Sequence, residues 1–121
     1  MQIHLEKPEQ HAIQSYNRQD VKINNQRYHD NLIVSRDTII HPWKANVIEA
    51  LNMDQLQPIL QCHPDIIIIG HSLLGKQLPL QILQAINQLQ IGIETMDIGA
   101  ASRTFNLLLS EHRRVVLAIL F

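Results

Sequence analysis

The first third of the chain alternates short apolar runs with polar turn residues. Val21-Lys22-Ile23 precedes the turn pair Asn24-Asn25, and the runs Leu32-Ile33-Val34 and Thr38-Ile39-Ile40 follow. Short runs rich in β-branched residues and broken by Asn and Asp are typical of strands joined by tight turns. We therefore predict an antiparallel meander over about residues 12–41.

A helical period replaces this pattern in two later segments. Asn52 or Asp54 is placed to cap a short helix that ends by His63-Pro64. A second helix is predicted from Pro79 to Gln90, because proline suits a first helical position and the apolar residues recur at helical spacing. These apolar residues are Leu78, Ile82, Ile86 and Leu89, and Gln81, Gln84, Gln88 and Gln90 lie mostly on the opposite face.

Three apolar runs in the second half predict strands. Ile66-Ile67-Ile68-Ile69, closed by Gly70, has no polar alternation, which is typical of a strand buried on both faces of a sheet. The other two runs are Ile91–Met96 and Val115–Leu120, and Asp97 is placed to cap a helix between them. The predicted order is β-α-β-α-β, as in an α/β fold.

One domain accounts for the whole chain. At 121 residues it has room for one sizeable core, and no repeat or linker divides it. We therefore predict a single domain over residues 1–121, with the meander at about 12–41 and the α/β half at about 52–121.

Composition excludes several classes of function. The net charge is −1, from 10 Lys and Arg against 11 Asp and Glu, and the cations are scattered, so no nucleic-acid partner is expected. No apolar run approaches the ~20 residues of a membrane span, and Met1–Pro8 lacks the pattern of a signal peptide. Cys62 is the only cysteine, which favours a reducing compartment and a packing role for its thiol. We expect a soluble, cytoplasmic protein, and the oligomeric state stays open.

The loop after the isoleucine strand has the spacing of a phosphate-binding loop, G-x-x-x-x-G-K, from Gly70 to Lys76. Gln77 replaces the Ser or Thr that would hold magnesium. Pro79 also starts the next helix too late for the Lys76 amide to line its N-terminus. Nucleotide hydrolysis is therefore not favoured.

A cleft is predicted where the strands end. Ligands of open α/β sheets bind beyond the carboxyl ends of the strands, which brings Gly70-His71-Ser72 near Asp97. Free amides from Ile98 to Ala101, with Arg103 one turn further in, would bind a small anion or carboxylate. The simpler interpretation, which the sequence favours, is a tight connection with a helix cap.

No metal, cofactor or catalytic group is predicted. None of the seven histidines is spaced i, i+3 or i, i+4 from another, and there is one cysteine. Trp43, the only tryptophan, is expected to pack in the core or an interface, with a cleft wall as the alternative.

The last predicted helix has an apolar face and a polar face. Ala101, Phe105, Leu108 and Leu109 form the first, and Ser102, Arg103, Asn106 and Ser110 the second. The ordinary interpretation is a solvated stripe, with Glu111 close to Arg114 at i+3. A buried polar cluster beneath another segment is the alternative, and the sequence leaves this choice open.

Four segments carry a resemblance to a known family. They are Ile13–Tyr16, Pro42-Trp43, Pro64–Gly70 and Ala100–Val115, the last with the pattern A-A-x-R-T-F-N-x-L-x-x-E-x-R. Over nearly its whole length the chain resembles the small-domain family that includes the mitochondrial respiratory complex I assembly factor and an adipogenesis-associated domain protein.

The resemblance implies a single three-layer α/β domain with a mixed central sheet and additional antiparallel strands. It implies no reaction, because the best-known branch looks like a non-catalytic assembly helper. The family loop that looks like Gly-Thr-Gly is Gly70-His71-Ser72 here, so its second glycine is lost. The family positions that carry over are Trp43, Gly70, Arg103, Asn106, Glu111 and Arg113.

These observations favour a non-enzymatic interaction or assembly factor with a protein partner, and they leave enzymatic activity open. The alternative is a domain that binds a small molecule or anion, or an enzyme, with its cleft at the carboxyl ends of the strands. The candidate cleft residues are Trp43, Gly70, His71, Ser72, Asp97, Arg103, Asn106, Glu111 and Arg113.

Overall fold

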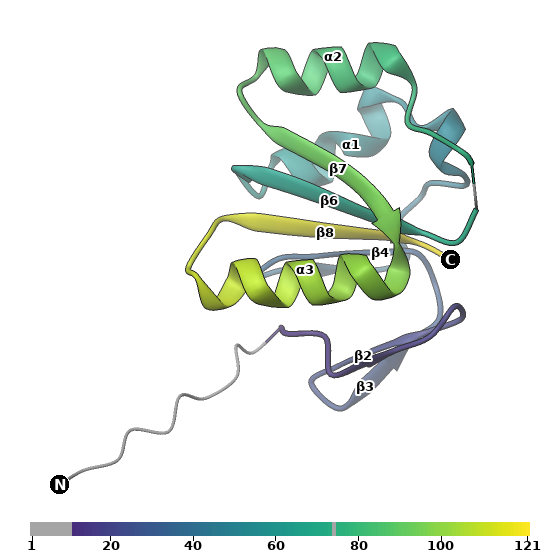
Figure 1. Cartoon of the computed structure of the whole chain (residues 1–121). Helices are drawn as coiled ribbons and strands as arrows, with labels where there is room; N and C mark the ends of the chain where they lie inside the picture. The colour runs from purple at the N-terminus through teal and green to yellow at the C-terminus, as the bar shows by residue number, and fades with distance from the viewer. Residues whose placement is uncertain (1–10, 74) are drawn as a thin grey trace, which may run out of the picture.

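Two β-sheets and three α-helices make up the part of the chain that the computed structural model describes, residues 11–73 and 75–121 (Figure 1). The segment Met1–Pro8, on which the signal-peptide prediction rests, lies outside the described residues.

The smaller sheet has three antiparallel strands in the order β1-β2-β3. These are β1 (Ser15–Tyr16), β2 (Val21–Ile23) and β3 (Gln26–Tyr28). Asn24 and Asn25 join β2 to β3 with φ values of 52° and 64°, the left-handed conformation that a two-residue hairpin turn requires. The predicted turn pair therefore forms the hairpin.

The larger sheet has five strands in the order β5-β4-β8-β6-β7. These are β4 (Leu32–Val34), β5 (Ile39–Ile40), β6 (Ile66–His71), β7 (Gly92–Asp97) and β8 (Val115–Leu120). β6 pairs in parallel with both β7 and β8, whereas β4 pairs antiparallel with β5 and β8. The sheet is mixed, and the predicted α/β fold class is confirmed.

The meander divides between the two sheets instead of forming one. All three residues of β4 are buried, so this strand needs cover on both faces and lies inside the larger sheet beside β8. In β2, Val21 and Ile23 are buried and Lys22 between them is partly exposed, the alternation of a sheet with one wet face. Asn31 marks the change of sheet, because its side chain donates to Ala45 O at 2.6 Å and accepts from Phe121 N at 2.8 Å.

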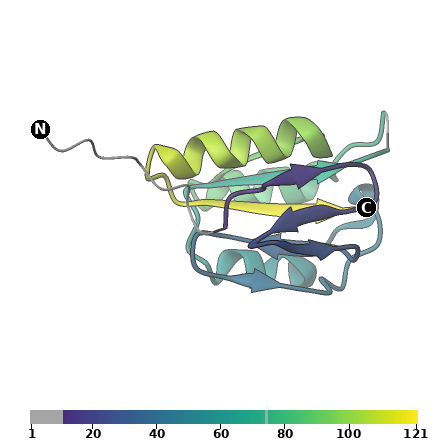
Figure 2. The same cartoon turned by 90° about the horizontal axis from the view of Figure 1, so that it is seen from below.

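The larger sheet is the middle one of three layers. One face packs against α1 (Met53–Leu60) and α2 (Leu80–Gln88), together with the short helix η1 (Ile48–Ala50). The other face packs against α3 (Ile98–Ser110) and the small sheet, as Figures 1 and 2 show from two sides. Ile67 and Ile69 point to the first layer and Ile68 to the other, so β6 is buried on both faces as predicted.

Local signals fix where the helices begin. Asn52 accepts from Gln55 N at 2.9 Å, and Gln55 Oε1 accepts from Asn52 N at 3.1 Å, a reciprocal capping box for α1. Asp97 caps α3 by accepting from Ala100 N at 2.8 Å, as predicted. Pro79 is the N-cap of α2 and not its first helical residue, so the helix begins at Leu80, one residue later than predicted.

The connections leave the sheet on opposite sides. After β6 the chain turns to α2 on one face, and after β7 it turns to α3 on the other face. Because β6 and β7 are parallel neighbours, their carboxyl ends lie side by side, and the two loops that follow them diverge to opposite faces of the sheet. This is the place where open α/β sheets hold ligands.

Candidate functional site

A cleft of about 800 Å³ lies at the carboxyl ends of β6 and β7. Its walls come from the β1–β2 turn, the loop after β6, the end of β7 and the first turns of α3. The lining residues are Tyr16, Asn17, Arg18, His71, Ser72, Leu73, Gly75, Lys76, Gln77, Thr95, Asp97, Ile98, Gly99 and Arg103. The volume is in the range of small-molecule sites.

Tyr16 and Arg103 join the small sheet to α3 across the cleft. Arg103 Nη1 donates to the Tyr16 hydroxyl at 2.5 Å, between residues 87 positions apart. The guanidinium carbon is 5.8 Å from the Tyr16 ring centre, so the hydroxyl contact is the closer of the two interactions. A Cβ at Gly99 would lie 2.9 Å from Tyr16 Cε2, so the absence of a side chain lets Tyr16 pack against the helix.

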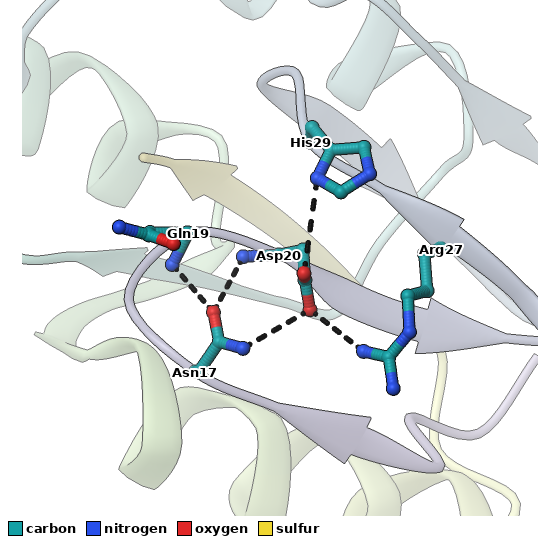
Figure 3. Close-up of polar contacts among 5 residues, drawn as sticks. All are labelled: Asn17, Gln19, Asp20, Arg27 and His29. Carbon is teal, nitrogen blue, oxygen red and sulfur yellow. Dashed lines mark hydrogen bonds and ion pairs between the residues drawn. The ribbon is translucent and has the colours of Figure 1, made fainter.

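Polar contacts among five residues in and beside the small sheet hold the β1–β2 turn that presents Arg18 (Figure 3). Asn17 Oδ1 accepts from Gln19 N at 2.7 Å and from Asp20 N at 2.8 Å. Asp20 Oδ1 pairs with Arg27 Nη1 at 3.0 Å, and Asp20 Oδ2 lies 3.7 Å from His29 Nδ1. The Asp20 side chain is only 14 % exposed, but Arg27 and His29 are 54 % and 69 % exposed, so these contacts position the turn and add little stability. The turn is therefore held on both sides of Arg18.

The lining of the cleft is positively charged. It holds three cations, Arg18, Lys76 and Arg103, against one carboxylate, Asp97, a formal charge of +2 where the whole chain carries −1. Lys76 Nζ lies 3.3 Å from Glu49 Oε2, and both side chains are about half exposed, so this pair is weak. Within residues 11–73 and 75–121, Arg18 forms no hydrogen bond or ion pair. The cleft favours a ligand with a negative group.

His71 stands at the end of β6 as a neutral donor. Its Nδ1 accepts from Leu73 N at 3.3 Å, which leaves the ring proton on Nε2. Partial burial lowers the pKa of His71 below its ordinary value of 6.5. At neutral pH the imidazole therefore offers an N–H group without adding charge.

Asp97 changes one part of the predicted cleft. The free amides expected from Ile98 to Ala101 are not all free, because the Asp97 carboxylate occupies the Ala100 amide at 2.8 Å. An anionic ligand at that amide would be repelled by the Asp97 carboxylate. Attraction for an anion therefore comes from the arginine side chains more than from the helix end.

Four of the nine predicted cleft residues line the cleft: His71, Ser72, Asp97 and Arg103. Gly70 lies just beneath it, where an added Cβ would be 2.8 Å from Ala101 Cβ. Gly70 therefore allows close packing of α3 on β6. It does not line the cleft, so its predicted role in the approach of a ligand has no support there.

The structure places the other four predicted residues away from the cleft. Trp43 is buried on the opposite side of the sheet, where its Nε1 donates to Gln55 O at 2.9 Å. Asn106 accepts from Ile13 N at 2.7 Å and donates to Ile13 O at 2.9 Å, so it anchors the N-terminal segment. Glu111 and Arg113 are exposed at the far end of α3, about 20 Å along the helix from its start.

Two details of the last helix differ from the prediction. Ser102 is fully buried among the core-facing residues of α3, and its hydroxyl donates to Ile98 O at 2.8 Å. Arg114 pairs with Asp65 at 3.1 Å, since β8 begins beside β6 and brings the two side chains together. The predicted solvated stripe therefore holds for Arg103 and Ser110, which are exposed, but not for Ser102, and the predicted pairing of Arg114 with Glu111 is replaced by the pair with Asp65.

The phosphate-loop spacing around Lys76 has no matching structure. α2 begins at Leu80, four residues after Lys76, and the Lys76 side chain pairs with Glu49. Among the described residues, no group of three or more His, Cys, Asp or Glu side chains is placed to hold a metal ion.

Sequence comparison identifies the family. The family described as "Protein of unknown function (DUF498/DUF598)" matches residues 13–120. The chain belongs to this family. A relative from Francisella tularensis subsp. holarctica, named "13 kDa major membrane protein", is 32% identical over 96 residues, which cover 77% of this chain and 76% of the relative.

Solved structures share the fold of this DUF498 chain. A Xanthomonas campestris protein matches with a TM-score of 0.83 and 28% identity, over 99% of this chain and 92% of its own. A Bordetella pertussis protein, described as a Mth938-like domain, matches with a TM-score of 0.80 and 19% identity over the same shares. A protein described as an outer membrane protein of Bartonella henselae has a TM-score of 0.78 and 22% identity, covering 93% of this chain and 96% of its own.

Two of these proteins are named as membrane proteins. In the described part of the present chain, no helix has the length and apolar character needed to cross a bilayer.

Sequence reasoning missed the wall that the β1–β2 turn contributes. Tyr16, Asn17 and Arg18 reach the cleft from a separate sheet, and Thr95 faces it from β7. The only available signal was that Tyr16 belongs to a segment with family resemblance, which gives no direction for its side chain.

Proposed function

We propose that this DUF498 chain is a non-enzymatic recognition module that binds an anionic group of its partner in the cleft. The observation that carries the proposal is the formal charge of +2 on the cleft lining of a chain with net charge −1. Guanidinium groups bind carboxylates and phosphates through paired N–H donors, and Arg18 and Arg103 supply two such groups.

The present contacts of the polar lining groups support binding in preference to a reaction. Asp97 is engaged as a helix cap, Lys76 in an ion pair and Arg103 in a bond to Tyr16. His71 has its Nδ1 occupied by a backbone amide, so its basic nitrogen does not face the cleft as a general base. The absence of a free acid, base or nucleophile among these groups supports binding over catalysis.

We prefer a protein as the partner, because the family that this chain resembles includes a branch of assembly factors. A cytoplasmic location is part of the same proposal and is supported by the single cysteine, Cys62. A free small anion would use the same chemistry, so the experiment includes both sources.

Titration with sulfate, inorganic phosphate and acetate, followed by amide chemical shifts at constant ionic strength, tests the anion site. We expect saturable shifts at Gly99 and Arg103, and the Arg103→Gln variant should weaken binding by about tenfold or more. Sulfate also stabilises proteins nonspecifically, so local shifts are more informative than melting temperature.

Arg113→Gln is the matched control for this experiment. It removes the same charge from an exposed residue beyond the far end of α3, outside the cleft. It should leave the anion affinity within about twofold, since the distance exceeds the screening length in physiological salt. Equal losses in both variants would mean that the anions follow net charge, and the proposed cleft function would be rejected.

A further inference from the structure

β7 forms one edge of the larger sheet. Among the described strands it pairs with β6 alone, and its six residues run from Gly92 to Asp97. Gly92, Glu94, Thr95 and Asp97 are exposed, so the strand is open to solvent over most of its length. An uncovered edge of this kind is able to accept another strand.

The backbone polarity of this edge follows from one hydrogen bond. Gly92 N donates to Asp65 O at 3.0 Å, so Gly92 directs its N–H toward the β6 side. Successive residues of a strand direct their N–H and C=O groups to alternate sides. Glu94 and Met96 therefore bond toward β6, and Ile93 and Thr95 direct their N–H and C=O groups to the open edge.

The open edge leads directly into the cationic cleft. Thr95 and Asp97 belong both to β7 and to the cleft lining, and the lining carries the formal charge of +2. An added strand that runs parallel to β7 ends with its carboxyl terminus at the cleft. An antiparallel strand would bring its positively charged amino terminus there, which the cations oppose.

We propose that this edge and the cleft together bind the extended C-terminal tail of a partner protein, which adds to the sheet parallel to β7. The terminal carboxylate lies at Arg103 and Arg18, and main-chain hydrogen bonds form with Ile93 and Thr95. This inference rests on the proposed anion-binding function and names the partner's chemistry.

The length and charge of β7 define the tail further. A strand of six residues spans about 20 Å, which matches a tail of about six residues. Glu94 is exposed on β7 three residues before Asp97. Neighbouring residues of parallel strands lie side by side, so a Lys or Arg about three positions before the tail's carboxylate would complement Glu94.

Synthetic hexapeptides with a Lys three positions before the C-terminus test the inference in calorimetric titrations. We expect the peptide with a free carboxylate to bind about tenfold or more tightly than the same peptide with a C-terminal amide. In the peptide with a free carboxylate, replacing the Lys by Glu should also weaken binding. Equal affinity of the free and amidated peptides would overturn the proposal.

Backbone pairing has its own test in two N-methylated peptides. Only one of the two alternating sets of peptide amides faces β7, so methylation of that set should abolish binding and methylation of the other set should be tolerated. Equal tolerance of both sets would exclude strand addition, whatever the fold of any protein variant.

Thr95→Pro is the corresponding change in the protein. It removes an N–H from the open edge and leaves the bonds of Glu94 and Met96 to β6 in place. Peptide affinity should fall at least tenfold, and urea unfolding of the variant checks that its fold is intact. A dimer of this chain that Thr95→Pro dissociates, with no peptide binding, would assign the edge to a second copy and overturn the proposal.

Failure of this inference and failure of the proposed function are distinguishable. Sulfate binding that depends on Arg103, with no binding of the peptides at millimolar concentration, would remove the tail and keep the anion site. Absence of both would remove the two proposals together.

Discussion

Gly70 and Ala101 bring β6 and α3 into closer contact than any pair with a side chain at position 70 would allow. A Cβ added at Gly70 would lie 2.8 Å from Ala101 Cβ and 3.4 Å from Ile98 Cα. Both neighbours belong to the first turns of α3, from which Arg103 projects into the cleft. The position of the cleft wall therefore depends on a glycine that does not line it.

Gly70→Ala should destabilise the protein by about 1–3 kcal/mol, because neither Ala101 nor the α3 backbone can yield without shifting the helix. Urea unfolding measures this change. Gly92→Ala is the control, since its added Cβ would meet Ile66 Cγ1 at an ordinary 3.5 Å. Similar losses at both positions would show that the tight approach at Gly70 is not the cause.

Asn106 should be a structural residue, not a ligand-binding one. Its amide makes two hydrogen bonds to the backbone of Ile13, and Asn106→Asp would keep the acceptor but lose the donor to Ile13 O. We expect a loss of about 1–3 kcal/mol and faster hydrogen exchange at the Ile13 amide. Ser110→Ala, at an exposed hydroxyl of the same helix, should change neither quantity appreciably. Sulfate affinity should stay at the wild-type value, and a tenfold loss there would return Asn106 to the binding site.

Tyr16→Phe separates the charge of Arg103 from its position. The variant keeps the aromatic ring against Gly99 and removes only the hydroxyl that accepts from Arg103. We expect sulfate affinity within about threefold of wild type, far above that of Arg103→Gln, because the guanidinium charge remains. A loss as large as that of Arg103→Gln would mean that Tyr16 must hold the guanidinium in place for an anion to bind.

Local sequence signals predicted those parts of the fold that local physics decides. The Ile66–Ile69 run predicted a strand buried on both faces, and capping residues predicted two helix starts, at Asn52 or Asp54 and at Asp97, because burial periodicity and capping act within a few residues. The division of the meander between two sheets is a choice among partners for β4, and nothing local to residues 32–34 specifies it.

Only part of the cleft was predicted, because only some of its residues are placed by the local β-α-β connection. Strand order places His71 near Asp97 in any fold of this topology, so those residues followed from the predicted β-α-β unit. Tyr16 meets Arg103 across 87 residues, and Trp43 lies on the opposite layer. A hydrophobic pattern shows that a side chain is buried but not on which side of the sheet.

The partial burial of His71 predicts a pH dependence of stability. Its pKa in the folded protein is lowered below 6.5, its ordinary value in the unfolded chain, so the unfolded chain binds more protons as pH falls through this window. The folded state should therefore lose stability between about pH 6.5 and the lowered pKa, and His71→Gln should lose less. Urea unfolding at pH 7.5 and 5.5 measures both proteins, and the other histidines cancel because the two chains share them. An unchanged pH dependence in His71→Gln would show that His71 is not the group responsible.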